Sequence, residues 1–241
     1  MLAEPFLIVA GTGILMILLS MALDRVWAAV TPVRGIYLVL RAPGIVLHEC
    51  SHILGCLITG AKIQKVVFFS EAGGSVTYTR PLIPWLGDVI ISTAPLFCIP
   101  LVLSLMTWGF ATYLGCTFPP FPDIISADTL QQTGVVLVSI FTGNLLYRQE
   151  YWFLVYLYLT VSLVLSIAPS AQDLRNAALG IVLVFLAGLL IFWSNIPWAV
   201  AVALEITRII GLGFTTGLFF LLIALACSLP VIVWYVFARI R

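Results

Sequence analysis

Long apolar runs, separated by short polar or proline-rich stretches, dominate the pattern along this chain. Most of these runs approach the roughly 20 residues that a helix needs to cross a bilayer. They occupy residues 6–23, 43–60, 86–114, 151–168, 177–194 and 213–237, with a shorter run at 134–147. The stretch 195–212 is ambiguous because Glu205 and Arg208 interrupt it, and the proline-rich residues 116–130 are expected to form a loop. The pattern predicts an all-α polytopic membrane protein with six or seven transmembrane helices.

Proline and glycine indicate where elements begin and turn around the second run. Pro43 suits the first turn of a helix, so we expect this span to start there and to end at Gly60. The following segment, 61–84, is rich in Val, Phe, Thr and Tyr around Gly73-Gly74. That composition is typical of two strands joined by a glycine turn. The sequence therefore predicts a small β-hairpin directly after the second span.

Composition agrees with a membrane setting. Of 241 residues, 62% are hydrophobic and 9% are charged, and the mean hydropathy is +1.17. Soluble domains usually carry about 25% charged residues. The net charge of +1 gives no electrostatic reason to expect a nucleic-acid partner. With no stretch that resembles a soluble domain, we expect one membrane-embedded domain over residues 1–241, and the five cysteines indicate no disulfide framework.

Arginines indicate an orientation. With seven spans, one side of the membrane would carry Arg25, Arg34, Arg41, Arg175, Arg239 and Arg241. Positively charged loops tend to be cytoplasmic, so we expect a cytoplasmic C-terminus. A second set of basic residues opposes this assignment, namely Lys62, Lys65, Arg80, Arg148 and Arg208.

Two histidines and a glutamate interrupt the second apolar run. The chain has only two histidines, and His48-Glu49-Cys50-Ser51-His52 places both in an HExxH pattern. Positions i and i+4 share one helix face, so both imidazoles can reach one zinc ion. Glu49 lies beside that face and is the candidate catalytic base. Burying these groups in a membrane is costly without a function, so we favour a site for one Zn²⁺ per chain over histidines that only bond to neighbouring helices.

Catalytic zinc sites usually have three protein ligands and one open position, and no third histidine exists. Asp173 is favoured as the third ligand because it lies in the first turn of a predicted helix, with Ser170 as its N-cap. The expected topology also gives it the same shallow depth as His48. Alternatively, Asp173 is only a carboxylate that stabilises the helix N-terminus.

Other residues could supply the third ligand by chemistry alone. Glu150 and Asp88 carry carboxylates, but the expected topology puts both toward the opposite surface. Cys50 and Cys56 carry thiols that bind zinc well. Cys50, however, points away from the histidine face of the predicted helix.

The hairpin and a later span supply candidate substrate contacts. Residues 66–69 and 74–79 could offer a strand edge to an extended substrate, with contacts from Gly73, Gly74, Ser75, Val76 and Thr77. The hairpin could equally be a solvent-side connection. Asn144 is a candidate donor to the oxyanion of a tetrahedral intermediate, although such asparagines more often bond a neighbouring helix.

Three stretches resemble the site-2 protease family of intramembrane zinc metalloproteases. "HECSHILGCLITG" is similar to the family's HExxH helix, "AGGSV" to its Gly-Gly-x-Val β-segment, and "APSAQDL" to its later aspartate motif. The resemblance covers about residues 43–180. It implies that His48, His52 and Asp173 bind zinc and that Glu49 is the catalytic base. It also implies cleavage of peptide bonds in or near transmembrane segments of membrane-protein substrates.

Two other functions are compatible with the motif. A metallopeptidase of the prenyl-protein-processing type also uses HExxH, and Glu150 or Glu205 would then have to be its third ligand. A transporter or scaffold could bind a metal at the same residues without catalysis.

Overall fold

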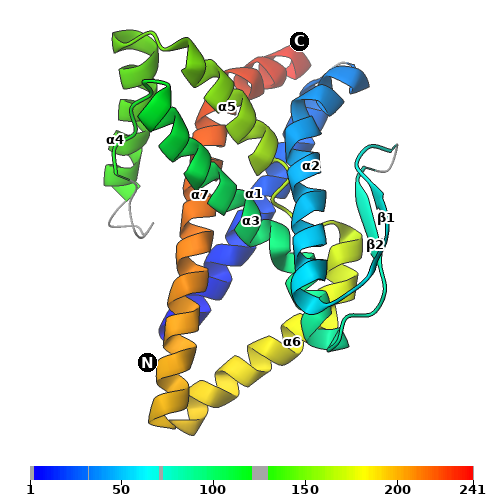
Figure 1. The fold of residues 1–241 in the computed structure, drawn as a ribbon. Helices are drawn as coiled ribbons and strands as arrows, with labels where there is room; N and C mark the ends of the chain where they lie inside the picture. The colour runs from blue at the N-terminus through cyan, green and yellow to red at the C-terminus, as the bar shows by residue number, and fades with distance from the viewer. Residues whose placement is uncertain (1–2, 32, 71–72, 121–129, 241) are drawn as a thin grey trace.

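The computed structural model describes residues 3–31, 33–70, 73–120 and 130–240. Residues 121–129 of the predicted loop, and Arg241, lie outside the described residues. The described part is mostly helical, with one small hairpin (Figure 1). Its elements are α1 (Glu4–Val30), α2 (Arg34–Thr59), β1 (Ile63–Val67), β2 (Ser75–Tyr78), α3 (Pro84–Tyr113), α4 (Leu130–Phe141), the π-helix η1 (Thr142–Tyr147), α5 (Tyr151–Val164), α6 (Ala171–Ser194) and α7 (Pro197–Ile240).

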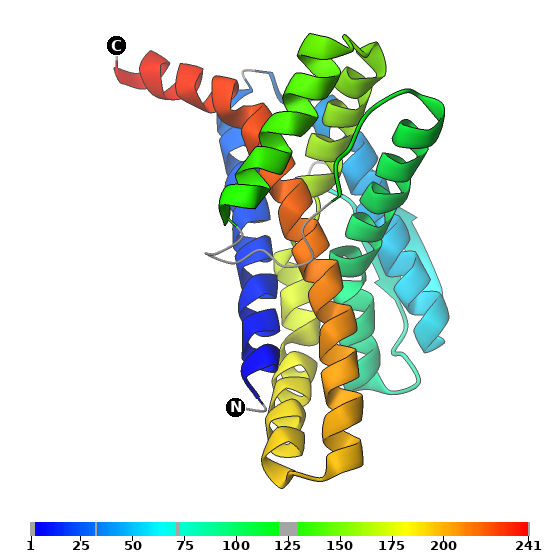
Figure 2. The same cartoon turned by 90° about the vertical axis from the view of Figure 1, so that its left-hand side faces the viewer.

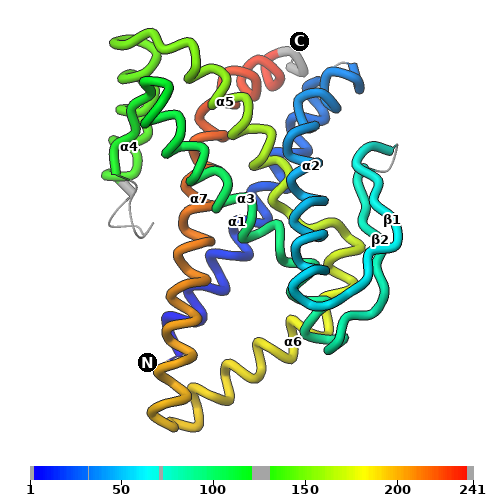
Figure 3. The backbone as a smooth tube through the Cα atoms, in the orientation of Figure 1, coloured from blue at the N-terminus to red at the C-terminus, as the bar shows by residue number. Residues whose placement is uncertain are grey.

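The helices form a bundle around α3, α5 and α7. Helix α1 packs along α7, while α3 contacts α2, α6 and α7, and α5 lies against α2 and α7. The long α7 extends through the height of the molecule, and α6 ends beside the start of α7, at an angle to it (Figure 3). Figure 2 shows α7 bending toward its C-terminal end, where Pro230 lies inside the helix. The core lies where α1, α3, α5 and α7 meet, and includes Met16, Ile99, Leu103, Tyr156, Val164, Phe220 and Ile223.

Five described helices are long and apolar enough to cross a membrane: α1, α2, α3, α6 and α7. This is fewer than the predicted six or seven spans. The ambiguous stretch 195–212 does not form a span of its own, because it continues into the next run as one helix of 44 residues. Helix α5 has only 14 residues, and α4 has 12 before the backbone changes to a π-helix.

Helix α2 begins at Arg34, so the prediction that it starts at Pro43 is wrong. Pro43 lies inside the helix, where its missing N–H leaves the carbonyl of Val39 without its usual donor. Helix α5 replaces that bond, because the Tyr158 hydroxyl donates to Val39 O at 2.9 Å. One helical turn further along α5, Ser162 Oγ accepts the Gly44 N–H at 3.1 Å. Tertiary hydrogen bonds therefore let α2 continue through a proline.

The earlier start of α2 changes the depth of the histidines. His48 is not in the first turns of the helix, as the sequence suggested, but 14 residues after Arg34, a rise of about 21 Å. Asp173, in the first turn of α6, lies beside His48 and His52. Arg175 is therefore beside the middle of α2, whereas the α1–α2 junction and the end of α7 share one end of the molecule (Figures 1 and 2).

The predicted hairpin is present. Strands β1 and β2 are antiparallel, with Val66 opposite Val76 and an irregularity between Ile63 and Lys65. Strand β2 contacts α2. Tyr78 binds the strand to α3 by donating to Asp88 Oδ1 at 3.4 Å. Burial, with the nearby Asp88 carboxylate, raises the pKa of Tyr78 to about 12, so its hydroxyl stays protonated and able to donate.

Removal of the Tyr158 hydroxyl tests whether its hydrogen bond to Val39 compensates for the N–H that Pro43 lacks. Tyr158→Phe should lower the free energy of unfolding by about 1 kcal/mol, the usual contribution of one hydrogen bond. In a Pro43→Ala background the restored N–H can bond Val39 O, so the same substitution should cost less. Thermal unfolding in detergent measures both costs, and Tyr151→Phe, at the exposed start of α5, is the matched control. Equal costs in the two backgrounds would contradict the compensation.

Candidate metal centre

Three side chains from two helices converge on one point. His52 Nε2 lies 3.1 Å from His48 Nε2 and 3.4 Å from Asp173 Oδ1, and His48 Nε2 lies 3.7 Å from Asp173 Oδ2. Both histidines are buried, with residue exposures of 8% for His48 and 5% for His52. The three ligand atoms lie within 4.8 Å of one another, so the group could hold a metal ion.

Backbone carbonyls orient both imidazole rings. His48 Nδ1 is 2.6 Å from Ser166 O, and His52 Nδ1 is 2.8 Å from Ile91 O. A carbonyl oxygen only accepts hydrogen bonds, so each Nδ1 carries a hydrogen and donates it. In the neutral rings both Nε2 atoms then present lone pairs to each other and to a carboxylate. That arrangement repels itself unless a metal ion lies among the three groups or one Nε2 carries a proton.

The spacing fits a metal ion. Ligand atoms placed tetrahedrally at about 2.0–2.1 Å from an ion are about 3.4 Å apart. The two Nε2 atoms are 3.1 Å apart, and each has a different oxygen of Asp173 nearby, at 3.4 Å for His52 and 3.7 Å for His48, so each separation is close to that value. Two imidazole nitrogens with a carboxylate are typical ligands of divalent transition metals, and three ligands leave a fourth position open.

The N-terminus of α6 positions Asp173. Ser170 is the N-cap, as predicted, and forms a capping box with Asp173: its Oγ accepts the Asp173 N–H at 3.2 Å. In return, Asp173 Oδ2 accepts from Ser170 N–H at 2.8 Å and from the Ser170 hydroxyl at 2.6 Å. The two predicted roles of Asp173, metal ligand and helix-stabilising carboxylate, are thus compatible, because the carboxylate that caps the helix is also directed at the histidines.

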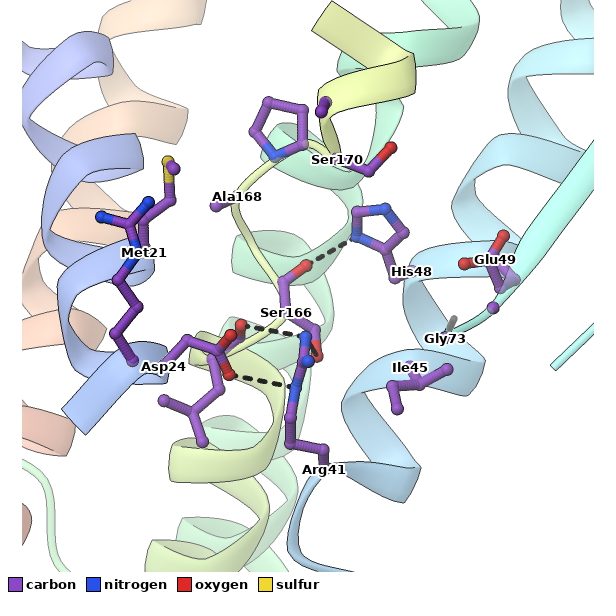
Figure 4. A pocket seen from close by; sticks show the side chains of 15 residues that line it. Met21, Asp24, Arg41, Ile45, His48, Glu49, Gly73, Ser166, Ala168 and Ser170 are labelled. Carbon is purple, nitrogen blue, oxygen red and sulfur yellow. Dashed lines mark hydrogen bonds and ion pairs between the residues drawn. The ribbon is translucent and has the colours of Figure 1, made fainter. Parts of the chain in front are cut away.

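Glu49 is buried at the edge of this cluster. Its exposure is 5%, and its Oε2 has no hydrogen-bond partner among the described residues. It interacts electrostatically with His48, His52 and Asp173. On its other side is the hairpin, since a Cβ at Gly74 would overlap Glu49 Oε1 and lie 2.7 Å from Cδ. Glu49 is therefore a carboxylate enclosed between the cluster and a glycine backbone (Figure 4).

A cavity of about 340 Å³ opens beside the cluster. Figure 4 shows His48 and Glu49 on one side of it and Asp24 on α1 opposite. Gly73 and Gly74 of the hairpin also line it. The serines and charged groups of the wall make this a polar space within an apolar bundle, which water can enter.

Two of the five hairpin residues predicted to contact substrate, Gly73 and Gly74, lie at the site. Gly73 and Gly74 line the cavity, and Gly73 has a positive φ of 101°. In β2, Val76 packs inward against Cys56 and Ile91, whereas Ser75 and Thr77 are exposed. The glycines therefore face the cavity and the side chains of Ser75 and Thr77 face outward, whereas the side chain of Val76 is partly buried.

Asn144 is not brought to the cluster. Its amide nitrogen donates to the carbonyls of Thr117 and Ile140, both at 2.8 Å, and its oxygen accepts from the Thr117 N–H. One amide hydrogen thus joins the π-helix to the loop at Thr117, and the other bonds the carbonyl of Ile140 in α4. Asn144 therefore has a structural role, although its partners are a loop and its own helical segment rather than a neighbouring helix.

The rival ligands also lie elsewhere. Asp88 accepts from Tyr78, Glu150 is the N-cap residue of α5, and Glu205 forms an exposed pair with Arg208. Cys50 is exposed, as its place opposite the histidine face predicted. Cys56 is buried with apolar residues and, like the others, is absent from the metal-competent group of the described residues.

Sequence reasoning missed the groups that orient the ligands. Ser166 and Ile91 act through backbone carbonyls, which no residue type reveals. It also missed the pair between Asp24 and Arg41, although Asp24 was visible as an isolated acid closing an apolar run.

Comparisons with models of known families, with characterised proteins and with solved structures find no match. The functional argument for this chain therefore depends on its own geometry.

The geometry predicts how metal binding responds to substitution. His48→Ala, His52→Ala and Asp173→Ala should each abolish stoichiometric binding of zinc, measured by elemental analysis after equilibration with the ion. Ser170→Ala removes only an orienting contact, so affinity should fall by about 10- to 100-fold.

Carboxylates outside the cluster provide the controls. Asp88→Asn and Glu150→Gln should bind zinc as the unmodified protein does, because neither contacts the ligands. Retention of stoichiometric zinc by both histidine variants would reject the site.

Proposed function

We propose that this protein is an intramembrane zinc endopeptidase that cleaves peptide bonds in or near transmembrane segments of other proteins. The observation that carries the proposal is the cluster of the two facing histidine Nε2 atoms with Asp173, beside a buried glutamate that has no hydrogen-bond partner among the described residues. A cluster that only stored or carried a metal would have no need of that glutamate. This favours catalysis over a metal-binding transporter or scaffold.

His48, His52 and Asp173 would hold the ion. Zinc, when bound, supplies a Lewis acid that polarises the scissile carbonyl and lowers the pKa of water. The carbonyls of Ser166 and Ile91 keep both rings in the tautomer that binding requires. Ser170 holds the carboxylate of Asp173 in place.

Glu49 would move the protons. It accepts one from the attacking water and delivers it to the amine of the leaving peptide, which is general acid–base catalysis. Its buried position keeps bulk water from competing for the carboxylate, while the polar cavity admits the water that hydrolysis consumes. The hairpin glycines hold Glu49 from the other side.

The substrate assignment follows from depth and from the hairpin. The histidines lie in the middle of a helix that is long and apolar enough to span a bilayer, so a membrane-embedded peptide meets them readily. A helical peptide hides its bonds in hydrogen bonds and must be unwound before cleavage. Strand β2, which contacts α2, offers backbone groups with which an extended segment can pair.

The proposal also includes the location of the protein and its orientation in the membrane. The chain would be a multi-pass membrane protein, with the end that carries the α1–α2 junction and the C-terminal end of α7 in the cytoplasm. Support comes from the arginines at that junction, Arg25, Arg34 and Arg41. A prenyl-protein-processing type of site is less well supported, since neither Glu150 nor Glu205 lies with the histidines.

Glu49→Gln separates catalysis from metal binding. The variant should keep stoichiometric zinc, because Glu49 is not a ligand, and should lose at least about 100-fold in cleavage of a membrane-embedded peptide. A chelator should inactivate the unmodified protein, and added zinc should restore it. Cleavage at the normal rate by zinc-loaded Glu49→Gln would remove Glu49 from the mechanism.

Gly74→Ala tests the contact between hairpin and base. The new methyl group must displace the Glu49 carboxylate. We expect cleavage to fall about tenfold or more with zinc content unchanged, since misplacing a catalytic group by about 1 Å can cost 10²-fold. Gly35→Ala is a control, because no atom lies within 4 Å of its added Cβ. An active Gly74→Ala protein would show that the base tolerates a displaced hairpin.

A further inference from the structure

A second charged group lines the cavity that contains Glu49. Arg41 Nε lies 3.2 Å from Asp24 Oδ1, joining α2 to α1. The remaining contacts of this guanidinium are long: 3.3 Å to the Tyr37 hydroxyl, 3.4 Å to Leu165 O and 3.5 Å to Ser166 Oγ. Hydrogen bonds from arginine to a carboxylate are usually about 2.7–2.9 Å long. The N–H groups of Arg41 therefore form only long hydrogen bonds in this structure.

The cavity wall carries two guanidinium groups and two carboxylates, and one of the carboxylates, Glu49, lies beside the histidines. Asp24 contributes the other carboxylate, while Arg25 and Arg41 contribute the two guanidinium groups. Arg25 is exposed and forms no ion pair within the described part of the chain. Asp24 is also shared, because it accepts from the Tyr37 hydroxyl at 2.6 Å. A further anion would balance the group formed by Asp24, Arg25 and Arg41.

Arg41 faces the same cavity as His48 and Glu49. Arg41, Ile45 and His48 follow one another along a single face of α2 (Figure 4). The seven residues from Arg41 to His48 correspond to a rise of about 10.5 Å. An extended peptide advances about 3.3 Å per residue, so that distance equals about three residues of substrate.

We propose that Arg41, assisted by Arg25, forms a subsite that binds an acidic side chain of the substrate about three residues from the scissile bond. The inference rests on the proposed peptidase function and adds the substrate class to it. In the unliganded protein, Asp24 occupies part of the guanidinium and competes with the incoming carboxylate. A peptide that extends from His48 into this cavity meets Arg41, so one occupant would contact both the reactive residues and the arginines.

Paired peptides test the subsite. Transmembrane peptides carry glutamate or glutamine at two, three or four residues from the scissile bond, on either side, with the bond located by mass spectrometry. The first readout is the ratio of kcat/KM for glutamate over glutamine. The second is the ratio of binding affinities to zinc-loaded Glu49→Gln protein, which does not require turnover.

Both ratios should be about tenfold in the unmodified subsite, at the position about three residues away, as expected for one charge-assisted pair. Arg41→Gln should bring both ratios to about one, and Arg41→Lys should keep part of the preference. Asp24→Asn should raise the ratios, because it removes the competing carboxylate. Arg34→Gln, one heptad earlier on α2 and outside the cavity wall, should leave them unchanged.

Opposite effects at Arg41 and Asp24 distinguish a subsite from a structural ion pair, whose two members would fail alike. Equal ratios of one at every position in the unmodified protein would overturn the proposal. So would an equal loss for both peptides in Arg41→Gln that depends on anionic lipid, since the arginine would then bind a lipid phosphate. Absence of any Glu49-dependent cleavage would refute the peptidase function, while the binding ratio would still decide on the subsite.

Discussion

The structure around the site depends on the repulsion among the side chains of His48, His52 and Asp173, which a cation removes. Two imidazole nitrogens, whose rings each donate their other N–H to a carbonyl, lie 3.1 Å apart and face a carboxylate. Without a metal ion or a proton among them, α2 and α6 would have to hold lone pairs against one another in an apolar bundle. With one, the same contacts connect α2, α3 and the start of α6. Metal binding and the local fold are thus expected to stabilise each other.

Helix α5 and the segment after it support this centre from behind. Tyr158, Ser162 and Ser166 recur every four residues and contact α2 at Val39, Gly44 and His48 in turn. A Cβ at Gly44 would overlap the backbone oxygen of Ser162, so the two chains approach closely there. The series both replaces the hydrogen bond that is missing at Pro43 and orients His48, a candidate metal ligand. The proline and the motif belong to one packing arrangement.

The cavity explains how such a centre can be useful inside an apolar molecule. Its wall combines the reactive residues with Asp24, Arg25 and Arg41, so water and a charged substrate group can be accommodated where the surrounding helices offer mostly hydrocarbon. In the proposed function, the same polar wall would limit which peptides fit. In the proposed function, the chemistry is performed at one end of the cavity, and recognition by charge takes place about 10.5 Å away, one heptad along α2.

Local periodicity along the chain was enough to predict apolar helices, a hairpin around Gly73-Gly74, and two histidines on one helix face with Glu49 beside it. The sequence also predicted Asp173 and its cap Ser170, because N-terminal helix chemistry is local. Other features could be seen only in the folded molecule. Helix α2 continues through Pro43, and residues 197–240 form one helix. Asn144 and Arg41 have partners that the sequence did not indicate. Each of these depends on partners distant in the chain, such as Tyr158 for Pro43, and such partners are set by packing rather than by neighbouring residues.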